Sequence, residues 1–190
     1  ANPSYRLNIQ DAGFRIAELL RARGVLGRFA VDFISVKEGD IFTNYAIEIN
    51  LRKGGTTLPY LMLQFMTNGT YDLETGLFRI PTGHPRYYYA SDNLQSPHYR
   101  GLVPDDLMDI LVSRQLYFHS ARQEGVVFHL MGALSEFGKL GLVCIGDSPE
   151  TAYGYYQQTV AILDQETHFS PHTHATPLPK YTTAPPLIEL

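Results

Sequence analysis

Two short segments decide the fold: Val31-Asp32-Phe33 and Glu48-Ile49-Asn50-Leu51-Arg52-Lys53-Gly54-Gly55. They lie in two runs rich in β-branched and aromatic residues, 29–36 and 45–51, which a polar connection around Asp40 separates. Two such runs with a short polar connection predict a β-hairpin with a loop of several residues. If the hairpin is centred near Asp40, opposed residues have numbers that sum to about 80.

This register gives the hairpin one polar face. Asp32 lies opposite Glu48, and Ala30 lies opposite Asn50. Because Glu48 and Asn50 are two residues apart on one strand, their side chains point to the same side. Asp32, Glu48 and Asn50 are therefore predicted to converge on one patch. The opposite, apolar face is predicted to pair Val31 with Ile49 and Phe33 with Ile47.

The patch predicts a divalent-cation site. Two carboxylates directly opposite each other on a strand pair repel, and a cation between Asp32 and Glu48 removes the repulsion. Carboxylate oxygens and the Asn50 carbonyl are hard donors of the kind that bind Mg²⁺ or Mn²⁺. A solvated polar face is the alternative explanation, and a register shifted by one residue would separate the three side chains.

A loop suited to an anion follows the second strand. Arg52 and Lys53 precede Gly54-Gly55-Thr56-Thr57. Glycines allow close backbone approach and free N–H groups, and the two cations favour a nearby anion. A simple turn explains the same residues, so the proximity of the predicted cation site is what favours the anion-binding interpretation.

These residues resemble a known family. Residues 27–33 and 45–57 resemble the end of an ATP-grasp domain, most closely in the carboxylate–amine ligase branch that includes the pheganomycin-type peptide ligases. D-Ala–D-Ala ligases share the more general Asp … Glu-x-Asn form. Residues 125–131 and 138–150 resemble the C-terminal region of the same branch. The resemblance does not extend to the middle of the chain or to the tail.

The resemblance implies a specific chemistry. ATP-grasp ligases phosphorylate a carboxylate with ATP, and an amine attacks the resulting acylphosphate. Small-molecule or peptide carboxylates and amines are then the substrates, and ATP with Mg²⁺ (or Mn²⁺) is the cofactor. Positioning and charge neutralisation do most of the work in phosphoryl transfer. The residues implied are the metal ligands Asp32, Glu48 and Asn50, the catalytic Arg52, and the cofactor-binding Lys53, Gly54 and Gly55.

The chain also departs from the family pattern. D-Ala–D-Ala ligases have an arginine two residues before the first metal-binding aspartate, where this chain has Ala30, and Arg28 lies four residues before Asp32. The nucleotide-binding lysines of the family lie further toward the N-terminus. The resemblance therefore implies the C-terminal part of a ligase, not competent alone, whose upstream ATP-grasp portion belongs to the same or another chain.

The expected helices and strands of the whole chain indicate an α+β fold. The expected fold is the C-terminal portion of an ATP-grasp fold with antiparallel hairpins and packed helices, followed by a small α/β extension. Asn8 and Asp147 are expected to cap helices. The expected helices are 7–23, 58–66, 104–115 and 149–164, with short strands at 77–80 and 86–90 and a second hairpin from 126–131 and 140–145. The expected segments are 1–66 of the ATP-grasp domain, an irregular connection 67–103, the α/β extension 104–166 and a Pro-rich tail 167–190.

Composition narrows the class of protein. A formal charge of −4 argues against nucleic-acid binding, which needs a basic surface. No run approaches the ~18 apolar residues of a membrane span. The single cysteine, Cys144, lies in an apolar run and is expected to be a small buried hydrophobe, so a reducing compartment and a cytoplasmic location are expected.

Other residues allow more than one interpretation. His129 is expected to be a core or partner-bonded histidine. Tyr87, Tyr88 and Tyr89 are expected to pack a strand against a sheet, with stacking on a base or substrate as the alternative. The spacing of His168, His172 and His174 can bind zinc or nickel. For the whole chain, a catalytically inactive ATP-grasp-derived binding or interaction module is the rival function, and a metal- or small-molecule-binding domain without ligation is a second.

Overall fold

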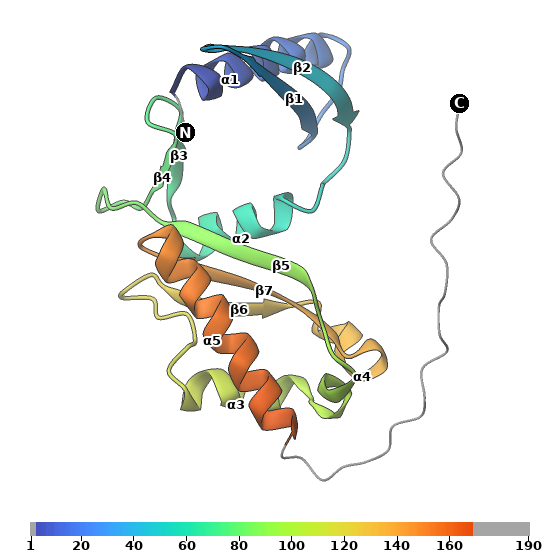
Figure 1. Ribbon diagram of the computed structural model, residues 1–190, viewed down its shortest axis with the longest axis vertical. Coiled ribbons are helices and arrows are strands. Elements are labelled where there is room, and N and C mark those ends of the chain that lie inside the picture. The colour runs from blue at the N-terminus through green and yellow to red at the C-terminus, as the bar shows by residue number, and fades with distance from the viewer. Residues whose placement is uncertain (1–2, 169–190) are drawn as a thin grey trace.

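The computed structural model describes residues 3–168 and has the expected α+β architecture (Figure 1). Helix α1 (Pro3–Ala22) lies beside a hairpin formed by β1 (Ala30–Glu38) and β2 (Ile41–Asn50). Helix α2 (Thr57–Thr67) and a small hairpin of β3 (Thr70–Asp72) and β4 (Leu77–Arg79) connect this part to a three-stranded antiparallel sheet.

The three-stranded sheet has the order β5–β7–β6, with helices on both faces (Figure 1). Strand β5 belongs to the segment expected to be an irregular connection, and the four-segment division remains a prediction. The strands are β5 (Tyr87–Gln95), β6 (Gly125–His129) and β7 (Lys139–Gly146). The remaining helices are η1 (Pro97–Gly101), α3 (Pro104–Ser113), η2 (Met131–Ala133), α4 (Leu134–Phe137) and α5 (Pro149–His168).

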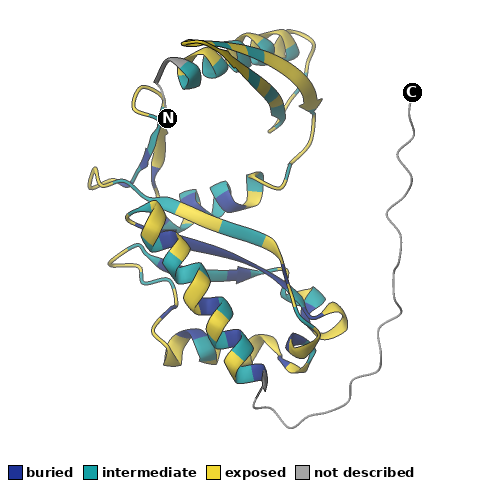
Figure 2. Ribbon diagram, viewed as in Figure 1, coloured by how far each residue is buried: buried dark blue, intermediate teal, exposed yellow. Residues whose placement is uncertain are grey.

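Strand β7 is buried along almost its whole length (Figure 2). Its side chains alternate between two cores, because successive residues of a strand point to opposite faces. Leu142 and Cys144 pack in one cluster with Leu163 of α5. Val143 and Ile145 pack in the other, with Leu63 of α2 among others. An unbroken apolar run is thus what a central strand covered on both faces requires.

Cys144 is fully buried, and burial raises the pKa of its thiol to about 12. The thiol therefore stays protonated at neutral pH, where a thiolate is the reactive form. The prediction that Cys144 serves as a small hydrophobe is confirmed. Nearby, the Tyr99 hydroxyl donates a hydrogen bond to Asp164, and burial with this contact raises the pKa of Tyr99. The bond ties η1 to α5.

Both predicted helix caps are wrong. Helix α1 begins at Pro3, so Asn8 lies inside the helix. For α5, the Thr151 N–H donates to the Ser148 hydroxyl at 3.0 Å, so the cap is Ser148 and not Asp147. Proline fits the first helical position because its missing N–H would be unpaired there anyway, which places the cap directly before Pro149.

The other predicted elements are confirmed, with shifted ends. Helix α5 continues to His168 and β5 to Gln95, past the predicted ends, and β6 with β7 forms the second antiparallel pair. Residues 169–190, with most of the predicted tail and with His172 and His174, lie outside the described residues. No helix within residues 3–168 is long and apolar enough to cross a membrane.

His129 lies at the end of β6, opposite Gly141 of β7. A Cβ atom at Gly141 would lie 2.1 Å from the imidazole, so the glycine provides the space for the ring. Both ring nitrogens are shielded from solvent, and neither has a hydrogen-bond partner within residues 3–168. Burial lowers the pKa of His129, although the charge of Asp92 opposes the shift. The histidine is therefore packed as a neutral side chain.

Acid is expected to destabilise the fold through His129. A base with a folded-state pKa below its unfolded value contributes stability above the unfolded pKa of about 6.5, and that contribution falls as the pH drops. We expect the free energy of unfolding, measured in urea, to fall between pH 8 and pH 5. His129→Phe should reduce this slope, whereas His84→Phe, at an exposed loop position, should leave it unchanged. Equal slopes for His129→Phe and the parent chain would contradict the assignment.

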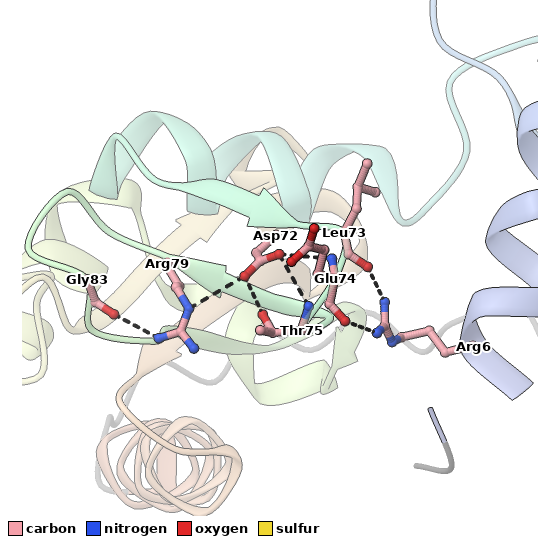
Figure 3. Close-up of polar contacts among 7 residues, drawn as sticks. All are labelled: Arg6, Asp72, Leu73, Glu74, Thr75, Arg79 and Gly83. Atoms are coloured by element: carbon pink, nitrogen blue, oxygen red, sulfur yellow. Dashed lines mark hydrogen bonds and ion pairs between the residues drawn. The ribbon is translucent and has the colours of Figure 1, made fainter. Parts of the chain in front are cut away.

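Arg6 joins α1 to the β3–β4 turn (Figure 3). Its guanidinium donates hydrogen bonds to the carbonyls of Leu73 and Glu74. Asp72 shapes the turn by accepting from the Thr75 hydroxyl and from the N–H groups of Thr75 and Glu74, and these bonds lower the pKa of Asp72. The turn thereby presents both carbonyls to Arg6 of α1 (Figure 3).

Arg6→Ala is expected to loosen α1 from the turn. Hydrogen bonds from a charged donor to exposed carbonyls contribute about 1 kcal/mol together in such a setting. Hydrogen exchange of the α1 amides should accelerate several-fold. Arg15→Ala is the matched control, because Arg15 makes an exposed ion pair with Asp11 within the same helix. Equal exchange rates in the two variants would show that Arg6 does not hold the helix.

Candidate functional site

The hairpin has the predicted register at its open end. Asp32 lies opposite Glu48, as expected, and the neighbouring pairs Ala30–Asn50 and Val31–Ile49 are confirmed as well. A bulge between Asp32 and Phe33 then shifts the pairing, so Phe33 faces Ala46 and the predicted Phe33–Ile47 pair is wrong. The turn is also shorter than predicted, with two residues, Gly39 and Asp40.

The bulge reconciles this short turn with the predicted open end. For the residue pairs between the turn and Phe33, the two residue numbers add up to one less than for the pairs at the open end. The bulge places one extra residue in β2, and this residue accounts for the difference. Bulges often lie next to active sites, where they aim particular side chains. Here the bulge directly follows Asp32.

Asp32, Glu48 and Asn50 share one face of the hairpin. The Asn50 amide nitrogen lies 3.4 Å from a carboxylate oxygen of Asp32, and Glu48 is the cross-strand partner of Asp32. Both carboxylates are exposed, and neither forms an ion pair with another described residue. Two unpaired carboxylates side by side with an amide are a donor set that fits Mg²⁺ or Mn²⁺.

This donor set is small. Within residues 3–168 no group of three His, Cys, Asp or Glu side chains could hold a metal ion. Asp32 and Glu48 with the Asn50 carbonyl are the ligands available at the patch. Magnesium commonly binds to proteins in this way, through one or two carboxylates, with water and phosphate oxygens completing the shell.

The predicted anion loop lies between β2 and α2. Arg52 is exposed, and its guanidinium lies 3.5 Å from the Lys53 carbonyl oxygen. The Gly54 N–H donates to the Thr57 hydroxyl at 3.1 Å. Neither Gly54 nor Gly55 has a positive φ, and a Cβ atom at either would meet nothing within 4 Å. The fold itself thus does not require glycine here, and the space beside the backbone is open.

A small pocket adjoins this loop, and it shares Arg28, Tyr60 and Tyr88 with a larger pocket. The larger has a volume of about 660 Å³ and lies among α2, β4 and the start of β5. The smaller has a volume of about 400 Å³ and extends to Ala30 and to Thr56 and Thr57 at the start of α2. The larger pocket is lined further by Leu63, Tyr71, Gly76, Leu77, Phe78, Arg86, Tyr87, Tyr89 and Pro149.

Arg28 lies at the junction of the two pockets. Its guanidinium carbon is 5.4 Å from the centre of the Tyr60 ring, a cation–π geometry. Arg28 precedes β1 and lies over α2, although a strand conformation would have placed it on the same face as Asp32. The arginine thus faces the pockets.

The tyrosines at the start of β5 have different surroundings. Tyr89 packs against Tyr153 and Tyr156 of α5, with ring centres 5.0 and 4.7 Å apart, which confirms the packing interpretation for this residue. Tyr88 lines both pockets, so its stacking on a ligand, the alternative interpretation, stays a prediction. Tyr60 was not predicted, because no local signal distinguishes it from the other tyrosines of the chain.

Comparisons with known proteins find similarity to one protein family over part of the chain and to one ligase over most of it. Residues 106–159 match the family described as PGM1 C-terminal domain, which is ATP-grasp-related. This match covers α3 to the first half of α5 and lies outside the hairpin. No solved structure matches the chain.

The chain is also similar to a ligase over most of its length. The chain is 31% identical over 163 residues to an L-propargylglycine–L-glutamate ligase of Streptantibioticus cattleyicolor. The match covers 86% of this chain and 33% of that protein, so the chain spans about a third of the relative's length. A continuous match of this length includes the whole hairpin. The resemblance to an ATP-grasp ligase of the peptide-ligase type is confirmed.

Proposed function

We propose that the chain supplies the metal-binding half of the active site of an ATP-dependent carboxylate–amine ligase. The observation that carries the proposal is the patch of Asp32, Glu48 and Asn50, in register on one hairpin face. Similarity to a ligase named for joining two amino acids supports the reaction class. An inactive ATP-grasp-derived binding module is the alternative, and the unpaired carboxylates argue against it because nothing in the fold needs them.

In the proposed reaction, ATP phosphorylates the substrate carboxylate and the amine displaces phosphate from the acylphosphate. Bound Mg²⁺ would neutralise the charge of the phosphates during transfer. Asp32, Glu48 and Asn50 would hold it by oxygen atoms that the hairpin fixes on one face. Arg52 and Lys53 add positive charge beyond the strand end. The backbone N–H of Gly55 would donate to the same anion, whereas that of Gly54 would first have to release the Thr57 hydroxyl.

A further ATP-grasp portion, in the same or another polypeptide, is proposed to cover the exposed apolar side chains of the hairpin. Ile47 is 58% exposed, and other large apolar side chains of both strands are exposed as well. Exposed apolar patches of this kind mark interaction surfaces. The relative is about three times as long as its match to this chain, which leaves room for such a portion. The face that carries Asp32 continues toward the turn with the exposed side chains of Ile34, Val36, Ile41 and Tyr45, whereas Ile49 lies opposite Val31 on the other face. Use of ATP and a buried, unreactive thiol favour a cytoplasmic location.

The test uses the longest natural polypeptide that contains this chain. It is supplied with ATP, Mg²⁺ and pools of amino acids and short peptides, and mass spectrometry follows ADP and new amides. ADP formation that depends on both an acid and an amine is expected, with one amide formed per ADP. Formation of neither ADP nor an amide across the pools would favour the inactive module.

A further inference from the structure

The two connected pockets contrast with the charge of the whole chain. The formal net charge is −4, yet the charged residues among those lining the pockets are Arg28 and Arg86. The larger pocket is walled mostly by tyrosine, phenylalanine and leucine side chains. Its volume of about 660 Å³ lies within the range of small-molecule sites. Aromatic walls and a positive end suit a ligand with an apolar body and a negative group.

The two arginines have different environments. Arg86 donates to the carbonyls of Gln123 and Arg122 and lies 3.6 Å from a Glu124 carboxylate oxygen, so its charge is already compensated. Arg28 is exposed and contacts the face of the Tyr60 ring. Stacking on an aromatic face leaves the edge of a guanidinium free to bind a carboxylate in a bidentate manner. Arg28 is therefore the cation available to a ligand.

The position of Arg28 connects the pockets to the acidic patch. The smaller pocket reaches Ala30, which pairs with Asn50, and Asp32 is two residues further along β1. A carboxylate held at Arg28 would thus lie between the aromatic walls and the candidate metal ligands. Among the described lining residues there is no aspartate or glutamate to pair with a free ammonium group.

We propose that the joined pockets bind the acid substrate, an aromatic or bulky apolar carboxylic acid whose amine is masked by an acyl or peptide bond, with Arg28 holding its carboxylate. The fate of the bound acid rests on the proposed ligase function, but its binding does not. Tyr88 contributes wall area to both pockets, and burial followed by the neighbouring Tyr60 raises its pKa, so its hydroxyl stays protonated at neutral pH.

The binding experiment uses the 190-residue chain without ATP or metal. N-acetyl-L-phenylalanine and the uncharged N-acetyl-L-phenylalaninamide are titrated into ¹⁵N-labelled protein, and amide shifts near Arg28, Tyr60 and Tyr88 are followed. The acid should bind about tenfold more tightly than the amide, because a charge-assisted hydrogen bond distinguishes the two ligands. Arg28→Gln should remove this preference. Tyr88→Ala should weaken binding of both ligands while keeping the preference.

Arg23→Gln is the control, an exposed arginine just before Arg28 that lines neither pocket and should leave both affinities unchanged. Equal affinities for acid and amide in the parent chain would overturn the proposal, as would a preference that survives in Arg28→Gln. The proposal would also be overturned if AMP shifted the same resonances at a lower concentration than the acid, because the pockets would then bind a nucleotide. The binding experiment contains no ATP, so its positive result would remain valid even if the ligation assay failed. If the ligase proved active but the acid did not bind to the joined pockets, the acid substrate would bind at another site.

Discussion

Glu48→Gln is expected to reduce ADP formation by a ligase carrying this chain about 100- to 1,000-fold. The substitution keeps the size of the side chain but removes one of the two carboxylate charges that face each other across the hairpin. Losing one preorganised electrostatic contact to the reacting phosphates typically has an effect of this order. Initial rates of ADP release at several Mg²⁺ concentrations measure it, and the variant should need more Mg²⁺ to reach half of its maximal rate.

Asp40→Asn provides the matched control for this substitution. Asp40 lies in the two-residue turn at the far end of the same hairpin, where asparagine is equally acceptable. Its rate and Mg²⁺ requirement should equal those of the parent enzyme. If Glu48→Gln behaved like Asp40→Asn, the patch would be a solvated polar surface.

Gly138→Ala is expected to have the largest effect on stability. Gly138 follows α4 with a φ of +59°, in the left-handed region, and an added Cβ would lie 2.1 Å from the Ser96 carbonyl oxygen. The contact is with backbone, and the Ser96 N–H donates to the Gly138 carbonyl at 3.0 Å, so the two segments cannot separate without losing that bond. We expect a loss of about 3–4 kcal/mol in the free energy of unfolding.

Urea unfolding monitored by circular dichroism measures this loss. Gly132→Ala is the control, because Gly132 lies in η2 without a positive φ and an added Cβ would meet nothing within 4 Å. Its stability should change by less than about 0.5 kcal/mol. Comparable losses in both variants would mean that the close approach of Gly138 to Ser96 is not rigid.

The sequence predicted those features that depend on local periodicity. The alternation of residues 29–36 and 45–51 indicated which side chains of each strand share a face, and a hairpin centre near Asp40 gave the correct pairing of Asp32 with Glu48. The apolar run of β7 likewise predicted a buried strand. The bulge after Asp32 was not predictable, because it arises from the difference between the short turn and the pairing at the open end.

Other features depend on tertiary contacts that no local pattern contains. The pockets form because Arg28, Tyr60 and Tyr88, which are far apart in the sequence, come together where α2 packs on the sheet. Arg28 was noted only as a departure from the family pattern, and its position over Tyr60 follows from that packing. The imidazole of His129, which has no hydrogen-bond partner among the described residues, similarly reflects the space that Gly141 leaves on the neighbouring strand.

The most direct test of a cation site at Asp32, Glu48 and Asn50 is paramagnetic broadening by Mn²⁺ in the ¹⁵N spectrum of this chain, recorded with and without ATP. Broadening should centre on the amides of these three residues, diminish as Mg²⁺ is added, and disappear in Glu48→Gln. Broadening that centres elsewhere, for example at Asp105 and Asp106 in the first turn of α3, or that persists unchanged in Glu48→Gln, would contradict the assignment.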